Sequence, residues 1–344
     1  MEIVLYKFDW LTDYFLTDIG NALSKKYNVR FILPRDDFED SKNTIFITFN
    51  GHGIERVKEA NVFDIYMDHP YIYLKKNIDS HPKNYFAFFV DKEHLRIIKE
   101  EHPEINSYFL PLAGRIPSCE RSINQLTDVC FVGSIRDKET RVSEKAKELI
   151  KVMLETYDDS YTVFKKLHPN ESINIPVLYQ ADRYCRDLYR RKAIETVVNA
   201  GFKTVIIGCG WNAYDFDKPV TIFKEMSNLE AEKFQCASKF AINVLPWFKN
   251  GPHDRIYTSI LCDAVVLTDK NEYLEKEFKN KESILFYDRN NMEQIPELLN
   301  YYIKNEEERF KIYRSGKKLV SENDTWLNRI YILEEVINGI ICTR

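Results

Sequence analysis

The chain has 344 residues, enough for two domains with separate cores, and its apolar and charged fractions are typical of globular proteins. A net charge of −4 at pH 7 gives no electrostatic reason to expect a nucleic-acid partner, since neutralising many phosphates normally requires a basic balance or patch. The sequence contains no uninterrupted apolar window of about 18 residues, and its start lacks the basic and apolar segments of a secretion signal. We therefore expect a cytoplasmic protein without a transmembrane segment.

Seven cysteines are scattered along the chain, and no two of them form a C-x-x-C pair: Cys119, Cys130, Cys185, Cys209, Cys236, Cys262 and Cys342. An odd number at irregular spacing indicates neither a disulfide framework nor a zinc site. We expect most of them to be buried thiols.

The first 112 residues alternate between apolar strands and amphipathic helices. Strands are predicted at 2–8, 29–33, 44–49, 63–67, 85–90 and 108–111, and helices at 11–27 and 92–101. This alternation predicts an α/β fold with a parallel sheet and crossover helices. Ligands of such folds meet the loops after the carboxyl ends of the strands. That rule places four polar residues on the functional rim: Asp9, His52, Asp68 and His69.

A second alternating series occupies residues 128–324. The segment 113–127 before it has no strong period and reads as an interdomain linker. Strands are predicted at 129–132, 204–207, 240–245, 264–268 and 283–287, and helices within 136–200 and at 229–237, 292–302, 306–320 and 326–340. The chain thus predicts two successive doubly wound, Rossmann-like halves.

The stretch 239–269 has the clearest local order. A strand is followed by a loop, by a helix whose apolar residues recur at helical spacing, and by a second strand. Pro252 stands where a first-turn proline would stand, so the backbone N–H groups of His253, Asp254 and Arg255 are expected to be free at a helix N-terminus. Such an end, with an arginine beside it, attracts phosphate.

Nine residues of this stretch follow one pattern in step: Asn243, Pro246, Arg255, Ile256, Tyr257, Cys262, Ala264, Leu267 and Thr268. With this spacing the stretch resembles the nucleotide-sugar site of GT-B glycosyltransferases, in particular the spore-maturation (CgeB-like) group within the glycosyl transferases group 1 family. The resemblance covers nearly the whole chain and is most specific across 128–269. It departs at Thr258, where the family usually has the glutamate that holds the donor ribose, and at Asp263, where the family has glycine.

The resemblance implies a GT-B architecture of two Rossmann-like domains that face a cleft. Residues 1–112 would bind the acceptor and residues 128–324 the nucleotide sugar. Residues 325–344 would form a last helix that crosses back to the first domain.

Transfer from a sugar nucleotide first requires a grip on the diphosphate. Arg255, with the N–H groups around His253 and Asp254, is the first candidate. Gly133 and Ser134 end the first strand of the second half, where a glycine lets the backbone approach a phosphate closely. A simple tight turn explains that pair equally well.

The donor also needs a pocket for base and ribose, and the resemblance assigns the region of Gly208 and Gly210 to it. Trp211 could stack on a base or cap the core. Asn243, Pro246 and Ile256 belong to the matching stretch. Thr258 would take the place of the ribose-binding glutamate with a single hydroxyl, and Asp254 or Asp269 could compensate.

The acceptor hydroxyl needs a base, for which two residues compete. Asp9 follows the first strand, beside the apolar Trp10, and could equally be the N-cap of the next helix. His69 is held before Pro70, and could equally be only hydrogen-bonded. His52 ranks after them, and the choice between inverting and retaining transfer stays open.

The sequence has no D-x-D motif in a convincing loop and no His and carboxylate cluster at ligand spacing, so we predict no metal and no resident cofactor. The resulting interpretation is a metal-independent glycosyltransferase that uses a nucleotide-diphosphate donor, a UDP-sugar before others. The acceptor would be a glycan, a protein or a small molecule. The alternatives are a GT-B pseudoenzyme that binds nucleotide or glycan, suggested by Thr258 and Asp263, a sugar-nucleotide epimerase or hydrolase, and a flavodoxin-like pair of domains with another ligand.

Overall fold

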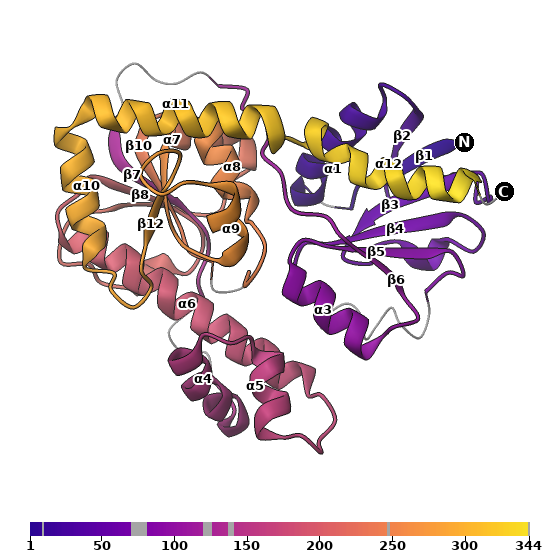
Figure 1. The fold of residues 1–344 in the computed structure, drawn as a ribbon, viewed down its shortest axis with the longest axis horizontal. Helices are drawn as coiled ribbons and strands as arrows, with labels where there is room; N and C mark the ends of the chain where they lie inside the picture. Colours follow the sequence, from indigo (N-terminus) through magenta and orange to yellow (C-terminus); the bar gives the residue numbers. More distant parts are fainter. Residues whose placement is uncertain (9, 70–80, 120–125, 137–140, 246–247, 343–344) are drawn as a thin grey trace. The chain divides into compact units, whose positions relative to one another are not determined.

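The structure is a computed structural model that describes residues 1–8, 10–69, 81–119, 126–136, 141–245 and 248–342. The chain divides into two compact units (Figure 1). The first unit is Met1–Ala113 with Asn323–Arg344, and the second unit is Gly114–Glu322. Each unit contains a sheet of six parallel strands flanked by helices, which confirms the predicted α/β class with two Rossmann-like halves. The second unit already begins at Gly114, where the sequence predicted a linker.

The sheet of the first unit has the strand order β2-β1-β3-β4-β5-β6. Its strands are β1 (Glu2–Tyr6), β2 (Asn28–Ile32), β3 (Thr44–Phe49), β4 (Asn61–Tyr66), β5 (Tyr85–Phe89) and β6 (Asn106–Phe109). The helices are α1 (Trp10–Leu23), the short η1 (Ile54–Arg56), α3 (Lys92–Glu101) and α12 (Trp326–Cys342). All residues of β3 and β4 are buried, as expected for strands covered on both faces. The strand order reverses between β1 and β3, and open α/β sheets bind ligands at the carboxyl ends of strands at such a point.

The C-terminal helix α12 completes the first unit by packing against α1. Its apolar face buries Leu333 and Ile337 completely, and Lys26 forms an ion pair with Glu334 at 2.8 Å. The helix begins after Thr325, whose hydroxyl accepts a hydrogen bond from the N–H of Asn328 at 3.4 Å. The last segment of the chain therefore folds with the first one.

The sheet of the second unit has the order β12-β11-β10-β7-β8-β9. Its strands are β7 (Thr127–Val132), β8 (Thr204–Ile207), β9 (Thr221–Phe223), β10 (Ser238–Asn243), β11 (Val265–Asp269) and β12 (Leu285–Tyr287). The sequence did not predict β9, which has three residues, none of them buried. When the six strands are numbered along the chain, their order across the sheet is the order found in dinucleotide-binding sheets. The strand order reverses between β7 and β10.

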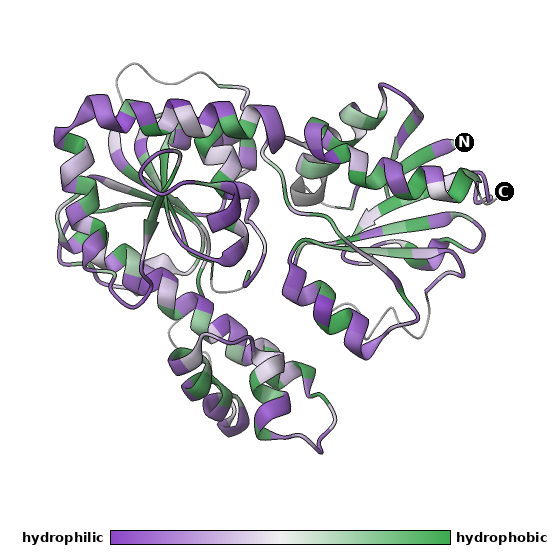
Figure 2. Ribbon diagram, in the orientation of Figure 1, coloured by the Kyte–Doolittle hydropathy of each residue, from purple (hydrophilic) through white to green (hydrophobic). Residues whose placement is uncertain are grey.

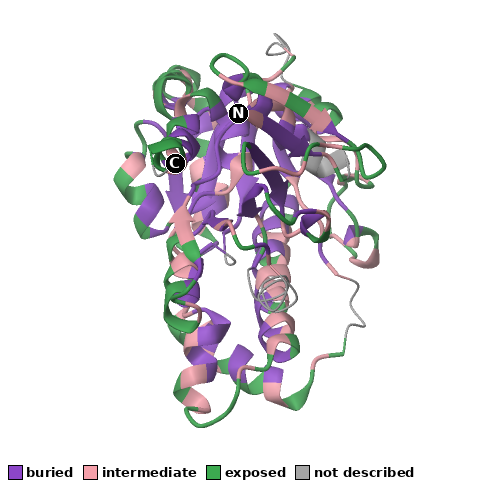
Figure 3. Cartoon of the chain, turned by 90° about the vertical axis from the view of Figure 1, so that its right-hand side faces the viewer, coloured by how far each residue is buried: buried purple, intermediate pink, exposed green. Residues whose placement is uncertain are grey.

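Nine helices, of which η2 is 3-10, accompany the described strands of this sheet: α4 (Glu144–Thr156), α5 (Ser160–Leu167), α6 (Ile175–Asn199), η2 (Trp211–Ala213), α7 (Asn228–Cys236), α8 (Asp254–Leu261), α9 (Glu272–Glu277), α10 (Gln294–Lys304) and α11 (Glu306–Asn323). The long helix α6 contacts α4, α5 and α10. Hydrophobic residues concentrate along the strands (Figure 2), and the same strands are largely buried (Figure 3).

The core of the first unit contains a buried carboxylate, Asp64 of β4, which has no exposed surface. Its oxygens accept hydrogen bonds from the N–H of Gly51 at 2.8 Å and the hydroxyl of Tyr85 at 2.6 Å. The hydroxyls of Tyr85 and Tyr66 lie 2.7 Å apart. Burial raises the pKa of Asp64 to about 6, although these hydrogen bonds oppose the shift. This network holds the turn after β3 onto β4.

We expect Asp64→Asn to be more stable than the wild type at pH 8, by up to about 3 kcal/mol. The folded-state pKa is raised from 3.8 to about 6, so the carboxyl stabilises the fold when protonated, and this contribution is lost as the pH rises from about 4 to above 6. Urea unfolding of both proteins from pH 4 to pH 8 measures the difference, which should shrink toward pH 4. In the control Asp68→Asn, which alters an exposed carboxylate, the difference should not follow pH. A constant difference for Asp64→Asn across this range would contradict the account.

Candidate functional site

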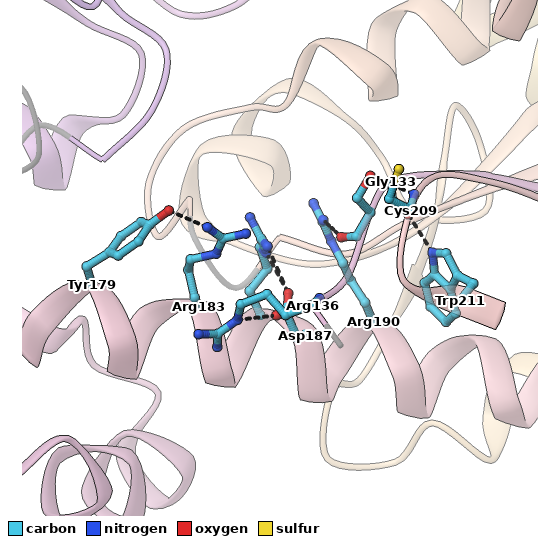
Figure 4. A network of polar contacts seen from close by, with 10 residues as sticks. Gly133, Arg136, Tyr179, Arg183, Asp187, Arg190, Cys209 and Trp211 are labelled. Atoms are coloured by element: carbon cyan, nitrogen blue, oxygen red, sulfur yellow. Dashed lines mark hydrogen bonds and ion pairs between the residues drawn. The ribbon is translucent and has the colours of Figure 1, made fainter. Parts of the chain in front are cut away.

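The candidate site lies at the carboxyl ends of β7 and β8 and at the start of α8, beside the point where the strand order of the second unit reverses. Gly133 and Ser134 follow β7. Gly208, Gly210 and Trp211 follow β8. Figure 4 shows this edge together with charged side chains that rise toward it from one side of α6.

The loops after β7 and β8 are locked together through close backbone contacts. A Cβ on Gly208 would lie 2.4 Å from the carbonyl oxygen of Gly133. Gly210 has φ +87°, and a Cβ there would lie 2.1 Å from the oxygen of Ile135. The N–H of Cys209 donates to Ser134 Oγ at 3.0 Å. These glycines thus permit the approach of backbone to backbone and fix the shape of the edge.

Trp211 belongs to the core. Its side chain has no exposed surface, its Nε1–H donates to the oxygen of Gly133 at 2.7 Å, and its ring meets Phe131 edge to face at 5.5 Å. No face of the ring is offered to a base. Of the two interpretations from the sequence, stacking on a nucleotide is therefore wrong, and capping of the core describes the residue.

Arg255 reaches from α8 to the end of β7. Its Nη1 donates to the oxygen of Val132, and a Cβ on Gly133 would lie 2.7 Å from that nitrogen. Burial lowers the pKa of Arg255 to about 10, so the guanidinium stays charged at neutral pH. Burial, with the charge of Arg255, lowers the pKa of His253 to about 4 and keeps that imidazole neutral.

The N-terminus of α8 is capped at one of the three N–H groups that the sequence predicted to be free, that of Arg255. His253 is the N-cap, and its Nδ1 accepts the N–H of Arg255 at 3.3 Å. Pro252 precedes the cap and is not in the first turn. The neighbouring Asp254 has a lowered pKa, because the opposing effects of His253 and Arg255 outweigh the burial that would raise it. The cationic side chain, and not the helix end, is therefore the main attraction for an anion.

Four further arginines gather at this edge, and the sequence analysis missed them. Arg190 donates from Nη1 to the oxygen of Ser134 at 2.7 Å and is 7% exposed. Arg136 and Arg186 both pair with Asp187, at 2.9 Å and 2.8 Å. Arg183 donates to the hydroxyl of Tyr179 (Figure 4). Burial and the charges of Arg186 and Arg255 hold the pKa of Arg190 well below its usual value.

The spacing of three of these arginines could have revealed them. Arg183, Arg186 and Arg190 recur at three and four residues, which puts them on one face of a helix. The sequence predicts only that this charged segment is mainly helical, because nothing in it indicates that this face meets the loop after β7. We define the arginine cluster as Arg136, Arg183, Arg186, Arg190 and Arg255.

Three other predicted donor residues are turned into the protein. Ile256 is fully buried. Thr258 is 4% exposed, and its hydroxyl accepts the N–H of Arg115 at 3.4 Å. Asn243 is 4% exposed, and its Nδ2 donates to Thr268 Oγ1 at 3.0 Å, although it lines one small pocket together with Arg255. Thr258 therefore does not offer its hydroxyl in place of the family's glutamate.

Asp269 is a structural carboxylate. It is 1% exposed, its Oδ1 accepts the N–H of Leu245 at 2.7 Å, and its Oδ2 pairs with Arg289 at 2.6 Å. The Arg289 guanidinium lies 5.4 Å from the ring centres of both Tyr157 and Tyr189. The prediction that Asp269 compensates at the ribose is therefore wrong, because both oxygens are already committed. Pro246, which follows Leu245, lies outside the described residues.

The departure at Asp263 has a conformational explanation. Its φ is +64°, a region that glycine favours and aspartate tolerates. Its Oδ1 accepts a hydrogen bond from Lys317 at 2.6 Å. The backbone at this position thus has a conformation that suits glycine, and aspartate adopts it here.

In the first unit, the predicted rim residues follow β3 and β4. The ring of His52 stacks on Phe8 at 4.0 Å, and Phe8 is 49% exposed. Asp68 is exposed and accepts a hydrogen bond from Asn50 at 3.2 Å. His69 is 2% exposed and lies 4.6 Å from the ring of His94, a setting that weakens it as a base for an incoming hydroxyl. Asp9, the other candidate base, lies outside the described residues.

Comparison with known proteins bears on the fold. Residues 186–335 match the family model described as glycosyl transferase-like. Sucrose-phosphate synthase from Thermosynechococcus elongatus superposes with a TM-score of 0.59 at 9% identity over 100% of both chains. The β-glucosyltransferase of T4 phage gives 0.59 at 9% identity over 99% of both chains. TarM gives 0.54 at 10% identity, over 88% of this chain and 55% of that one. No curated protein matches the sequence.

The chain therefore has the GT-B fold of the glycosyltransferases. Residues 186–335, which match the glycosyl transferase-like family model, contain α8 with Arg255 and most of the arginine cluster. The finer resemblance to the spore-maturation group stays a prediction. None of the described helices is both long and apolar enough to cross a bilayer.

We expect Gly133→Ala to weaken nucleotide binding by at least about tenfold, or roughly 1.4 kcal/mol. The new methyl group would lie 2.7 Å from Arg255 Nη1 and force the guanidinium away from its place. Titration calorimetry with UDP measures the effect. The matched control is Gly339→Ala in α12, where a Cβ meets no atom within 4 Å and binding should not change. Equal affinity in both variants would contradict the assigned position of Arg255.

Proposed function

We propose that the chain is a glycosyltransferase whose second unit binds the diphosphate of a nucleotide sugar through the arginine cluster. The observation that carries this proposal is an excess of cationic charge at the ligand-binding edge of the sheet. Five arginines gather there; among the described residues, Asp187 pairs with two of them and Asp254 lies beside Arg255. Arg190 is buried and the other four arginines are half-buried. Like charges brought together with little water around them repel one another unless an anion joins them, and a diphosphate supplies that anion.

The same charges suit the chemistry of transfer. The bond between the anomeric carbon and the donor's phosphate oxygen breaks while the acceptor oxygen forms a bond to that carbon. The diphosphate leaves with the bonding electron pair, and the acceptor's proton passes to a base. Arginines positioned at the leaving group stabilise the charge that develops on it. They take the part that a divalent cation would take, so we propose metal-independent transfer.

The donor we propose is a UDP-sugar. Support comes from the neighbours: α-glucosyltransferase was solved with UDP-glucose, and TarM with UDP. One neighbour was solved with UDP and Mn²⁺, so metal independence requires its own test. A glycan, protein or small-molecule acceptor and a cytoplasmic location complete the proposal. The net charge of −4 argues against the DNA acceptor of some neighbours.

We place the acceptor on the first unit, at the carboxyl ends of β1 and β3. The exposed ring of Phe8 with His52 and the exposed carboxylate of Asp68 are groups suited to a sugar ring and its hydroxyls. Asp9 is the first candidate for the base, because the ring of His69 is buried. Asp9→Asn should abolish transfer and leave UDP affinity unchanged.

A thermal-shift screen tests the donor site. The protein is mixed with UDP, GDP, dTDP and CMP, alone and as their sugar conjugates, with EDTA in every sample. Binding to the folded state raises the midpoint by mass action. We expect a shift with UDP or its sugars that is lost in Arg255→Ala, and no shift with any nucleotide would overturn the proposal.

One observation favours a second candidate, a nucleotide-binding protein without transfer activity. The hydroxyl of Thr258 is hydrogen-bonded to Arg115, so the usual ribose contact has no substitute at that position. Incubating the protein with UDP-glucose and UDP-N-acetylglucosamine and a panel of acceptors discriminates the two. Binding of UDP without release of UDP from either donor would favour this candidate, and release without any acceptor would favour a hydrolase.

A further inference from the structure

Three cysteines that are far apart in the sequence converge in the second unit. Cys119 lies in the segment that enters the unit, Cys236 is the last residue of α7, and Cys262 is the C-cap of α8. Their Sγ atoms all lie within 4.8 Å of one another. The sequence does not indicate this group, because none of the three cysteines belongs to a close pair and only the fold brings them together.

The surroundings of these thiols combine burial with one open side. Cys236 and Cys262 are 3% and 1% exposed, whereas Cys119 is half-buried. The thiol of Cys236 lies 3.6 Å from the carbonyl oxygen of Cys119, and that of Cys262 lies 3.7 Å from Gln235 Oε1. Contacts of this length are weak for the two thiols. The main neighbours of each sulfur atom are therefore the other two sulfur atoms.

We propose that Cys119, Cys236 and Cys262 bind one Zn²⁺ ion. Three converging thiolates are the donor set of a thiophilic d¹⁰ cation, and zinc with sulfur ligands is four-coordinate. The half-buried side at Cys119 admits water as the fourth ligand. Three thiolates with one Zn²⁺ carry a net charge of −1, and the neighbouring pair of Glu232 and Arg115, 3.7 Å apart, adds none.

The site would serve the structure of the unit rather than transfer itself. It would bind the entering segment to the C-terminal ends of α7 and α8, and α8 carries Arg255 at its other end. A metal ion that binds only the folded state stabilises that state. The stabilisation grows with the logarithm of the free metal concentration divided by the dissociation constant. The inference is independent of the donor nucleotide, since it rests on different residues and a different readout.

The test measures metal content and thermal midpoint in the full-length protein. Protein reduced and then freed of reductant is loaded with Zn²⁺, dialysed, and assayed for zinc per chain. Co²⁺ replaces zinc in a parallel sample, because thiolate ligands give an intense charge-transfer band in the near ultraviolet. We expect about one equivalent of zinc, the Co²⁺–thiolate band, and a midpoint that falls when a chelator removes the metal.

Cys119→Ser is the principal variant, because a half-buried residue changes with little risk to folding. It should lose the Co²⁺–thiolate band and at least about tenfold in zinc affinity, or roughly 1.4 kcal/mol. The matched control Cys342→Ser alters an exposed cysteine in the first unit and should behave as the wild type. Zinc bound equally by Cys119→Ser would overturn the proposal.

Other outcomes also overturn it. If wild-type protein with fully reduced thiols retains no zinc, the proposed site is excluded. A disulfide between two of the three cysteines that persists in freshly isolated protein would assign them to redox chemistry.

Discussion

Arg255→Ala is expected to lower the turnover of a UDP-sugar by about a hundredfold to a thousandfold, the usual effect of removing one group that stabilises developing charge. The guanidinium lies against Gly133 and bonds to the oxygen of Val132, at the edge where the other four arginines gather. Its loss removes a positive charge from the site of the leaving diphosphate. Release of UDP measured with a coupled assay at saturating acceptor gives the rate.

Two controls accompany that variant. The first control is Arg191→Ala, which removes the arginine next to Arg190 on α6. The side chain of Arg191 is 37% exposed and pairs with Glu195. Because exposed ion pairs contribute little, activity should stay within about twofold of the wild type. The thermal midpoint of Arg255→Ala shows whether the fold persists. Wild-type turnover in a folded Arg255→Ala protein would exclude the arginine cluster as the diphosphate site.

Asp269→Ala is expected to destabilise the second unit by about 3–5 kcal/mol, the usual cost of removing one partner from a buried ion pair. The change leaves the guanidinium of Arg289 buried beside Tyr157 and Tyr189 without its carboxylate, and it leaves the N–H of Leu245 without its acceptor. Urea unfolding followed by tryptophan fluorescence measures the loss.

The matched control for this variant is Glu275→Ala. Glu275 lies on α9, is exposed, and pairs with Lys270 at 3.2 Å, so its loss should cost less than about 0.5 kcal/mol. A cost for Asp269→Ala as small as that of the control would contradict the structural role and would return Asp269 to the list of ribose contacts.

The elements around β10, α8 and β11 could be predicted because local pattern determines them. Short apolar runs end at turn residues, and Ile256, Ile260 and Leu261 recur at helical spacing. The same reasoning located Gly133, Gly208 and Gly210 at strand ends, where the structure requires a residue without a Cβ. The alternation of strands and helices was enough to infer two parallel sheets.

The contacts that make the site could not be predicted, because they join positions far apart in the chain. Arg190 bonds to Ser134 from a helix that the sequence presents only as charged, and Trp211 turns its N–H to Gly133 instead of to a ligand. Asp269 ends a strand, as a ribose-binding aspartate would, and only the fold reveals Arg289 beside it. Side-chain partners of this kind follow from tertiary packing, which no local spacing encodes.

The most direct test of the central claim compares UDP with uridine by titration calorimetry in the presence of EDTA. If the arginine cluster holds the diphosphate, UDP should bind at least about a hundredfold more tightly than uridine, a difference of roughly 2.7 kcal/mol, and the preference should fall in Arg255→Ala. The preference should also weaken as salt is raised, since it rests on charge. Uridine and UDP binding with equal affinity, or UDP not binding at all, would contradict the claim that this edge of the sheet is a diphosphate site.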